Sequence, residues 1–134
     1  MLLSKSMIAI TKVGFWLTLI VLTYLFLVPP QYLVPDIFDW WDKLQHSLAF
    51  GVLTFLGLIA YCTNQIQVRR MVLALVSYGA LIEILQSVSG WRYGEFRDWL
   101  ADLLGIFIAV VIFRFLRNNS TFAKLIPKGI NLWI

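Results

Sequence analysis

The chain has 134 residues, of which 60% are hydrophobic and 13% are charged, and its mean hydropathy is +0.82. A soluble domain carries roughly 25% charged residues, so this composition excludes a water-soluble globular fold and indicates an integral membrane protein. The net charge of +4 does not indicate nucleic-acid binding, because the basic residues stand between and after apolar runs instead of forming one stripe. The single cysteine, Cys62, excludes an internal disulfide and a cysteine-based zinc site.

The first apolar run extends from about residue 7 to residue 28, and only Lys12 interrupts it, near its start. It ends at Pro29 and Pro30, which do not readily continue a helix. A signal peptide is the alternative interpretation, but no small-residue cleavage pattern follows Val28. We therefore expect a retained membrane helix here.

The next segment, residues 29–43, replaces the apolar pattern with three prolines, three acids and the pair Trp40-Trp41. Tryptophan and proline in such a segment are typical of a connection at the membrane surface. Three more apolar runs of about 18 to 19 residues follow, near the length that spans a bilayer core. They cover residues 44–62, 71–88 and 98–116, and a tail covers residues 117–134. The sequence predicts an all-α polytopic bundle of four transmembrane helices in one domain, residues 1–134.

Lysine and arginine counts predict the orientation of this bundle, since cytoplasmic loops carry an excess of these residues. One side would hold the larger set: Lys5, Lys12, Arg69, Arg70, Arg114, Arg117, Lys124 and Lys128. The other side would hold Lys43, Arg92 and Arg97. We therefore expect both termini in the cytoplasm, with the tail lying on anionic lipid.

Ionisable side chains at membrane depth are costly, so each is a candidate functional residue. Three polar pairs, each three or four positions apart, share a helix face: Asp42 with His46, Glu83 with Gln86, and Asp98 with Asp102. Helices two and four would begin where helix three ends, so we expect the pairs to converge in a polar pocket that opens outward. Arg92 and Arg97 in the adjoining loop suit a phosphate or carboxylate.

These residues resemble the VanZ-like family of bacterial membrane proteins over roughly residues 42–105. The elements of the resemblance are Asp42, Lys43, His46 and Phe50; then Gly79, Glu83 and Gln86; then Arg92, Asp98, Asp102 and Gly105. Family members often have asparagine where this chain has Asp102. The resemblance implies a protein of the bacterial cell envelope, in a family associated with glycopeptide (teicoplanin) resistance.

Two kinds of chemistry remain open for the polar pairs. His46 is a candidate general acid or base, with Asp42 orienting it and Glu83 or Asp98 as acidic partner; its alternative is a structural hydrogen-bonded pair with Asp42. Ser87 and Ser89 lie near, but no strained turn or oxyanion motif makes either a nucleophile.

A hard cation could use the oxygens of Glu83, Asp98 and Asp102. The signature loop for calcium is missing, however, and Arg92 and Arg97 can neutralise the same acids. We therefore expect no metal and no cofactor.

Our first functional hypothesis is headgroup binding in the bacterial inner (cytoplasmic) membrane. The ligand would be a phospholipid, a lipid-linked cell-wall precursor or a glycopeptide, and the binding residues would be Lys43, Glu83, Gln86, Arg92, Arg97 and Asp102. The alternatives are an intramembrane enzyme acting on a lipid headgroup, and a small accessory subunit that packs against a larger membrane protein.

Overall fold

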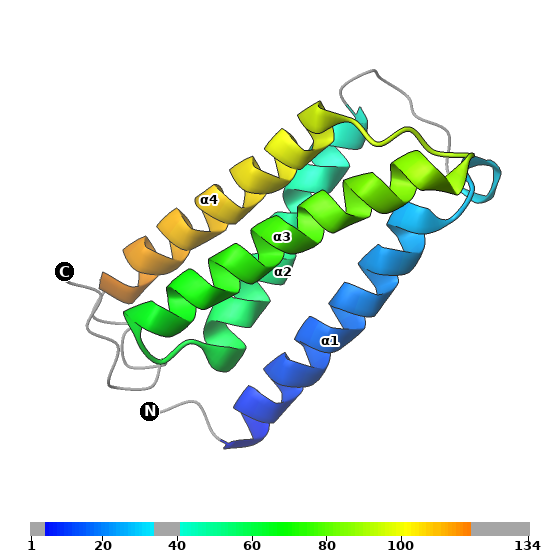
Figure 1. Cartoon of the computed structure of the whole chain (residues 1–134). Coiled ribbons are helices and arrows are strands. Elements are labelled where there is room, and N and C mark those ends of the chain that lie inside the picture. The colour runs from blue at the N-terminus through cyan, green and yellow to red at the C-terminus, as the bar shows by residue number, and fades with distance from the viewer. Residues whose placement is uncertain (1–4, 34–40, 119–134) are drawn as a thin grey trace.

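Four long helices and one short 3-10 turn form the described part of the chain. The computed structural model describes residues 5–33 and 41–118 (Figure 1). The elements are α1 (Lys5–Leu27), η1 (Pro30–Tyr32), α2 (Trp41–Tyr61), α3 (Gln65–Ser89) and α4 (Phe96–Asn118). Each of the four α-helices is long and apolar enough to cross a membrane. The predicted all-helical class and the four apolar helices are thus confirmed for these residues.

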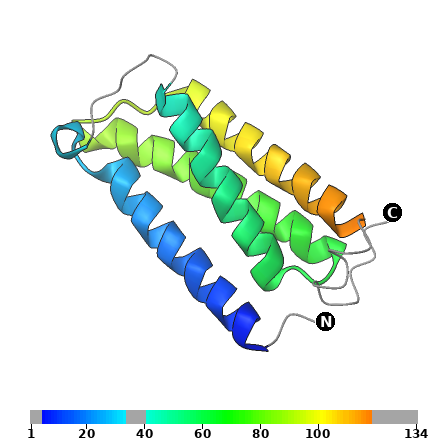
Figure 2. The ribbon, with the colours of Figure 1, turned by 180° about the vertical axis from the view of Figure 1, so that it is seen from behind.

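The helices run alternately up and down, so the two ends of the bundle hold different segments. The end of α1, the start of α2, the end of α3 and the start of α4 lie at one end, which we call the polar end (Figure 1). The start of α1 and the end of α4 lie at the opposite, terminal end. Seen from behind, α2 runs between α1 and α4 (Figure 2).

The backbones of α2 and α4 approach closely because two glycines face each other. A Cβ atom on Gly105 would collide with the carbonyl oxygen of Ser47, and one on Gly51 would lie 3.5 Å from the carbonyl oxygen of Gly105. Small residues at such crossings let membrane helices pack backbone to backbone. This contact places the first turns of α2 and α4, which carry the polar residues, side by side.

The core lies along α2, and α1 packs on it through Phe15 and Phe26. Phe50, Leu53, Leu75 and Ile82 are buried there, with Phe26 from α1 packed against them. Within the described residues α1 contacts α2 and α3 but not α4, and only 11% of its apolar window is buried. The apolar side chains left exposed suit contact with lipid, since hydrocarbon is as apolar as the residues themselves.

The start of the third helix was predicted wrongly. Its apolar run begins at Met71, but α3 begins at Gln65, because the Asn64 side chain caps it by accepting a hydrogen bond from the Gln67 amide (3.0 Å). Arg69 and Arg70 are therefore helical instead of part of a loop. Residues 119–134 of the predicted tail and the acids Asp36 and Asp39 lie outside the described residues, whereas Arg117 and Asn118 belong to α4.

Candidate functional site

Buried polar side chains gather at the polar end of the bundle, where helices α2, α3 and α4 meet. The set consists of His46, Glu83, Gln86, Asp98 and Asp102, all with less than a tenth of their surface exposed. The predicted convergence of residues from these three helices is therefore confirmed. The predicted outward opening of the pocket is not confirmed, since each of these side chains is less than a tenth exposed.

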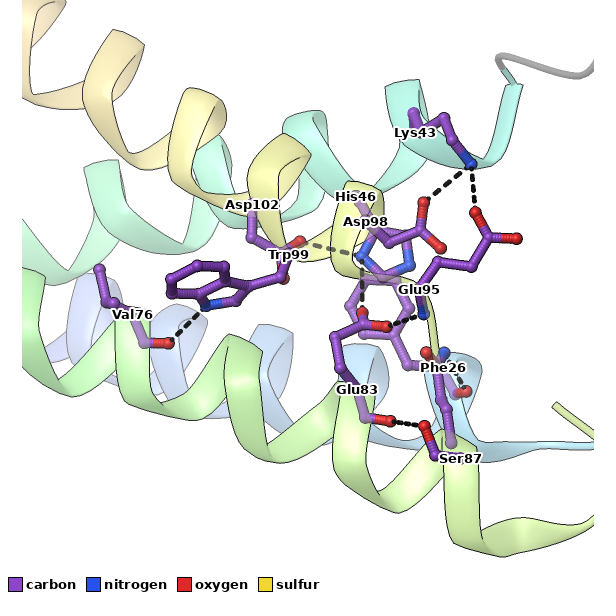
Figure 3. A network of polar contacts seen from close by, with 11 residues as sticks. Phe26, Lys43, His46, Val76, Glu83, Ser87, Glu95, Asp98, Trp99 and Asp102 are labelled. Atoms are coloured by element: carbon purple, nitrogen blue, oxygen red, sulfur yellow. Dashed lines mark hydrogen bonds and ion pairs between the residues drawn. The ribbon is translucent and has the colours of Figure 1, made fainter. Parts of the chain in front are cut away.

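His46 is at the centre of this cluster and is 1% exposed. Its Nδ1–H donates to Asp102 Oδ1 at 2.9 Å, and Glu83 Oε1 lies 3.8 Å from the same nitrogen (Figure 3). The Phe26 ring stacks on the imidazole, with 4.4 Å between centroids. Three other helices thus fix the orientation of one α2 side chain.

Asp42 was the partner predicted for His46, on the basis of its position one turn away. The hydrogen bond is instead made by Asp102, 56 positions along the chain. Asp42 remains close, because Asp42, His46 and Asp98 each have a ligand-type atom within 4.8 Å of the others. Contacts between helices, rather than the spacing within α2, decide the pairing.

Lys43 neutralises the start of α4. Its Nζ atom lies 3.0 Å from Asp98 Oδ1 and 3.3 Å from Glu95 Oε2 (Figure 3). The Asp98 side chain is 3% exposed and that of Lys43 32%, so the lysine reaches inward from the surface to a buried carboxylate. Glu95 lies in the loop between α3 and α4, 52 positions from Lys43, so no spacing in the sequence indicates this pairing.

The loop after α3 folds back over the end of that helix. Gly90 ends α3 with φ 83°, a left-handed conformation that glycine adopts without strain. The loop then lies so close to α3 that a Cβ atom on Gly94 would collide with the Glu83 carbonyl oxygen. As a result the Glu95 amide reaches the Glu83 side chain and donates to Oε2 at 2.8 Å.

Gly79 provides the space that Asp102 occupies. A Cβ atom at Gly79 would lie 2.7 Å from Asp102 Oδ2 and 3.3 Å from the Phe50 ring. Nearby, the Trp99 indole of α4 donates to the Val76 carbonyl of α3 at 3.2 Å (Figure 3). These contacts hold α4 against α3 at the depth of the carboxylate.

Gln86 and Arg92, both predicted to bind a ligand, donate hydrogen bonds to carbonyl groups at the end of α1. Gln86 Nε2 donates to the Phe26 carbonyl (2.9 Å), and Arg92 donates to the carbonyls of Leu25 (3.2 Å) and Val28 (3.5 Å). The last carbonyls of a helix lack partners within it, and a cation there also offsets the helix dipole. No sequence pattern indicates this role, because every residue carries the same backbone carbonyl group.

Arg97 differs from Arg92 because it lies on the exposed surface of α4. Their predicted role in binding a phosphate stays a prediction. The hydroxyl groups of Ser87 and Ser89 donate to the carbonyls of Glu83 (2.8 Å) and Gln86 (2.7 Å). Both serines thus hydrogen-bond to backbone carbonyls of their own helix, as is common near a helix end.

An apolar groove lies beside the cluster, on the outer face of the α2–α4 contact. It has a volume of about 400 Å³, and its walls include Ser47, Leu48, Gly51, Gly105 and Ile108. Ser47 is one helical turn from Lys43, so the groove and the lysine lie on the same face of α2. The groove therefore extends from the polar end towards the middle of the bundle.

Comparison of this chain with protein-family models, with curated proteins and with solved structures finds no match. The resemblance to the VanZ-like family therefore stays a prediction that depends on the motifs alone. What the chain can bind has to be argued from its own residues.

Proposed function

We propose that this protein is a bacterial cell-envelope protein of the VanZ-like kind that binds a lipid-linked headgroup in the inner membrane. The apolar chain of the lipid lies in the α2–α4 groove, and its phosphate meets Lys43 and Arg97 at the polar end. The observation that carries this proposal is that an apolar groove lies on the same face of α2 as Lys43, one turn away. A lipid is the ligand that offers both an apolar chain and a phosphate.

The proposal includes the orientation of the bundle in the membrane. With both termini in the cytoplasm, the polar end faces outward, where undecaprenyl-type precursors and phospholipids present their headgroups. The basic residues Arg69, Arg70, Arg114 and Arg117 support this orientation, because they belong to the start of α3 and the end of α4, at the terminal end. Altered exposure of a cell-wall precursor would then explain a link to glycopeptide resistance.

Native mass spectrometry of the detergent-extracted protein tests lipid binding. Leu48 lines the groove and is 60% exposed, whereas Ile84 is equally exposed (59%) on α3. Leu48→Trp fills the groove without disturbing the core, and Ile84→Trp is its matched control. We expect wild type and Ile84→Trp to retain a phosphate-bearing lipid and Leu48→Trp to lose most of it.

A second comparison addresses the headgroup. Arg97→Ala removes an exposed cation from the polar end, and Arg70→Ala removes one from the start of α3. We expect only Arg97→Ala to weaken retention of phosphate-bearing lipid. Folded wild-type protein without lipid, or equal retention by both tryptophan variants, would contradict the proposal. A stoichiometric protein adduct would instead favour the accessory-subunit hypothesis.

Acid–base catalysis on a lipid headgroup is the second candidate, and the 2.9 Å His46–Asp102 hydrogen bond is the observation that favours it. A carboxylate on Nδ1 fixes the tautomer so that Nε2 is free to accept a proton. His46→Gln separates the two functions. Loss of turnover of a labelled headgroup with lipid retention unchanged would support catalysis by His46.

A further inference from the structure

Three ligand-type atoms from three helices surround one point in the buried cluster. His46, Glu83 and Asp102 each contribute a nitrogen or carboxylate oxygen that lies within 4.8 Å of the other two. Nδ1 is 2.9 Å from Asp102 Oδ1 and 3.8 Å from Glu83 Oε1. Ligands about 2.0–2.2 Å from a tetrahedral ion lie roughly 3.3–3.6 Å apart, so these separations bracket those of a bound ion. We propose that His46, Glu83 and Asp102 bind a divalent transition-metal ion.

Unpartnered polar atoms of the same residues support a ligand here. Glu83 Oε1, Asp102 Oδ2 and His46 Nε2 are buried and have no hydrogen-bond partner among the described residues. His46 is 1% exposed and Asp102 is fully buried. Buried polar atoms are normally paired, because leaving one unpaired costs roughly 1–3 kcal/mol. A cation between the carboxylates gives Glu83 Oε1 the partner that it lacks.

The charges at this point also call for a cation. Two carboxylates, Glu83 and Asp102, face one imidazole, and even a protonated His46 leaves one negative charge uncompensated. The ion pairs of Lys43 are with Asp98 and Glu95, and the Arg92 guanidinium donates to α1 carbonyls. An uncompensated charge at this depth is expensive. Arg92, which was expected to neutralise these acids, makes its hydrogen bonds to the end of α1.

A proton on Glu83 would remove the charge but would not complete the hydrogen bonding. Its hydroxyl would need an acceptor, and Glu83 Oε1 lies 3.8 Å from His46 Nδ1, beyond hydrogen-bonding distance. That nitrogen already donates to Asp102. A metal ion needs no such acceptor, because it binds Glu83 Oε1 directly. It also takes the place of the proton on His46 Nδ1, and the neutral imidazole then carries its one proton on Nε2.

The neighbouring group of Asp42, His46 and Asp98 is equally compact but is less suited to a cation. Lys43 Nζ lies 3.0 Å from Asp98, so a positive charge already occupies that side. The ligand set of one imidazole nitrogen and two carboxylate oxygens suits Zn²⁺ or Mn²⁺ better than Ca²⁺ or Mg²⁺, which prefer oxygen alone. Three protein ligands also leave a coordination position for water or a ligand.

Metal content of tag-free protein, purified in detergent and dialysed against Zn²⁺ or Mn²⁺, tests the site. We expect one ion per chain in the wild type and at least about a 100-fold loss of affinity in the Glu83→Gln, Asp102→Asn double variant, which removes two ligands. Glu95→Gln and Asp42→Asn are matched controls that remove nearby carboxylates and should keep the ion. Leu48→Trp should also keep it, so failure of the lipid proposal can be told from failure of this one.

A measurement on wild type alone guards against a double variant that does not fold. X-ray absorption of the zinc-loaded protein should show one imidazole, oxygen ligands and no sulfur. Folded wild type without a stoichiometric ion, a spectrum without imidazole, or unchanged binding by a folded double variant would overturn the proposal.

Discussion

Cys62 shows how burial sets the chemistry of a single residue. It follows α2 directly, is 4% exposed, and packs in a cluster with Leu58, Val68 and Phe113. Burial raises the pKa of its thiol to about 11, because a thiolate loses hydration when it is enclosed by apolar groups. At pH 8 only about one thiol in a thousand is then ionised, and the thiolate is the reactive form.

We therefore predict slow alkylation of the native protein. Iodoacetamide labelling at pH 8 should be at least tenfold slower in mild detergent than after denaturation in SDS, as followed by mass. The chain has one cysteine, so the label reports on this site alone. Equal rates in the two detergents would show that Cys62 is exposed.

The buried carboxylates differ in how much positive charge lies near them. Asp98 has a lysine within 3.0 Å, whereas Glu83 and Asp102 share one imidazole. The difference follows from depth. Lys43 lies at the start of α2, so its long side chain can extend from the surface to Asp98. His46 lies about one turn deeper, and its short side chain does not extend to the surface.

At the scale of helices, glycines determine how closely the polar segments approach. Gly79 lies against Asp102 Oδ2, whereas nothing lies within 4 Å of a Cβ atom placed on Gly14 of α1. We predict that Gly79→Ala destabilises the protein by about 1–3 kcal/mol, since it overpacks a carboxylate held by His46. Gly14→Ala should instead stabilise it by up to about 1 kcal/mol, because alanine is the better helix former.

Unfolding of both variants in SDS titrations, followed by circular dichroism, measures the two changes. The prediction would be wrong if Gly79→Ala unfolded at the same SDS fraction as the wild type. A loss in Gly14→Ala of the same size as in Gly79→Ala would show that the loss does not depend on the space for Asp102.

Hydropathy predicted the helices well because each apolar run is nearly continuous over the length of a bilayer. It predicted the start of α3 poorly, because the first residues of this helix are polar. A helix can extend beyond its apolar run, since its backbone hydrogen bonds do not depend on apolar side chains. Spacing within α2 and α3 predicted which side chains share a face, and the alternating helix direction predicted their convergence. Their partners were not predictable, because the Asp102–His46 and Gln86–Phe26 contacts depend on how helices dock.

At the scale of the bundle, the four candidate spans in residues 5–33 and 41–118 place the start of α1 and the end of α4 at the same end (Figure 1). We predict that reporters fused to either terminus give the same result. A fluorescent protein should be bright and alkaline phosphatase inactive at both positions, as expected for cytoplasmic termini. Phosphatase activity at one terminus alone would exclude four spans, and activity at both would reverse the bundle.

The end of α1 is completed by residues that are synthesised much later. The Tyr24 carbonyl accepts from the Val28 amide, but those of Leu25, Phe26 and Leu27 accept from side chains 60 to 67 positions further on. During translation these carbonyls lack their side-chain partners until residues 86–92 have been synthesised. The contacts that tie the end of α1 to the bundle therefore form only after α3 and the loop that follows it are in place.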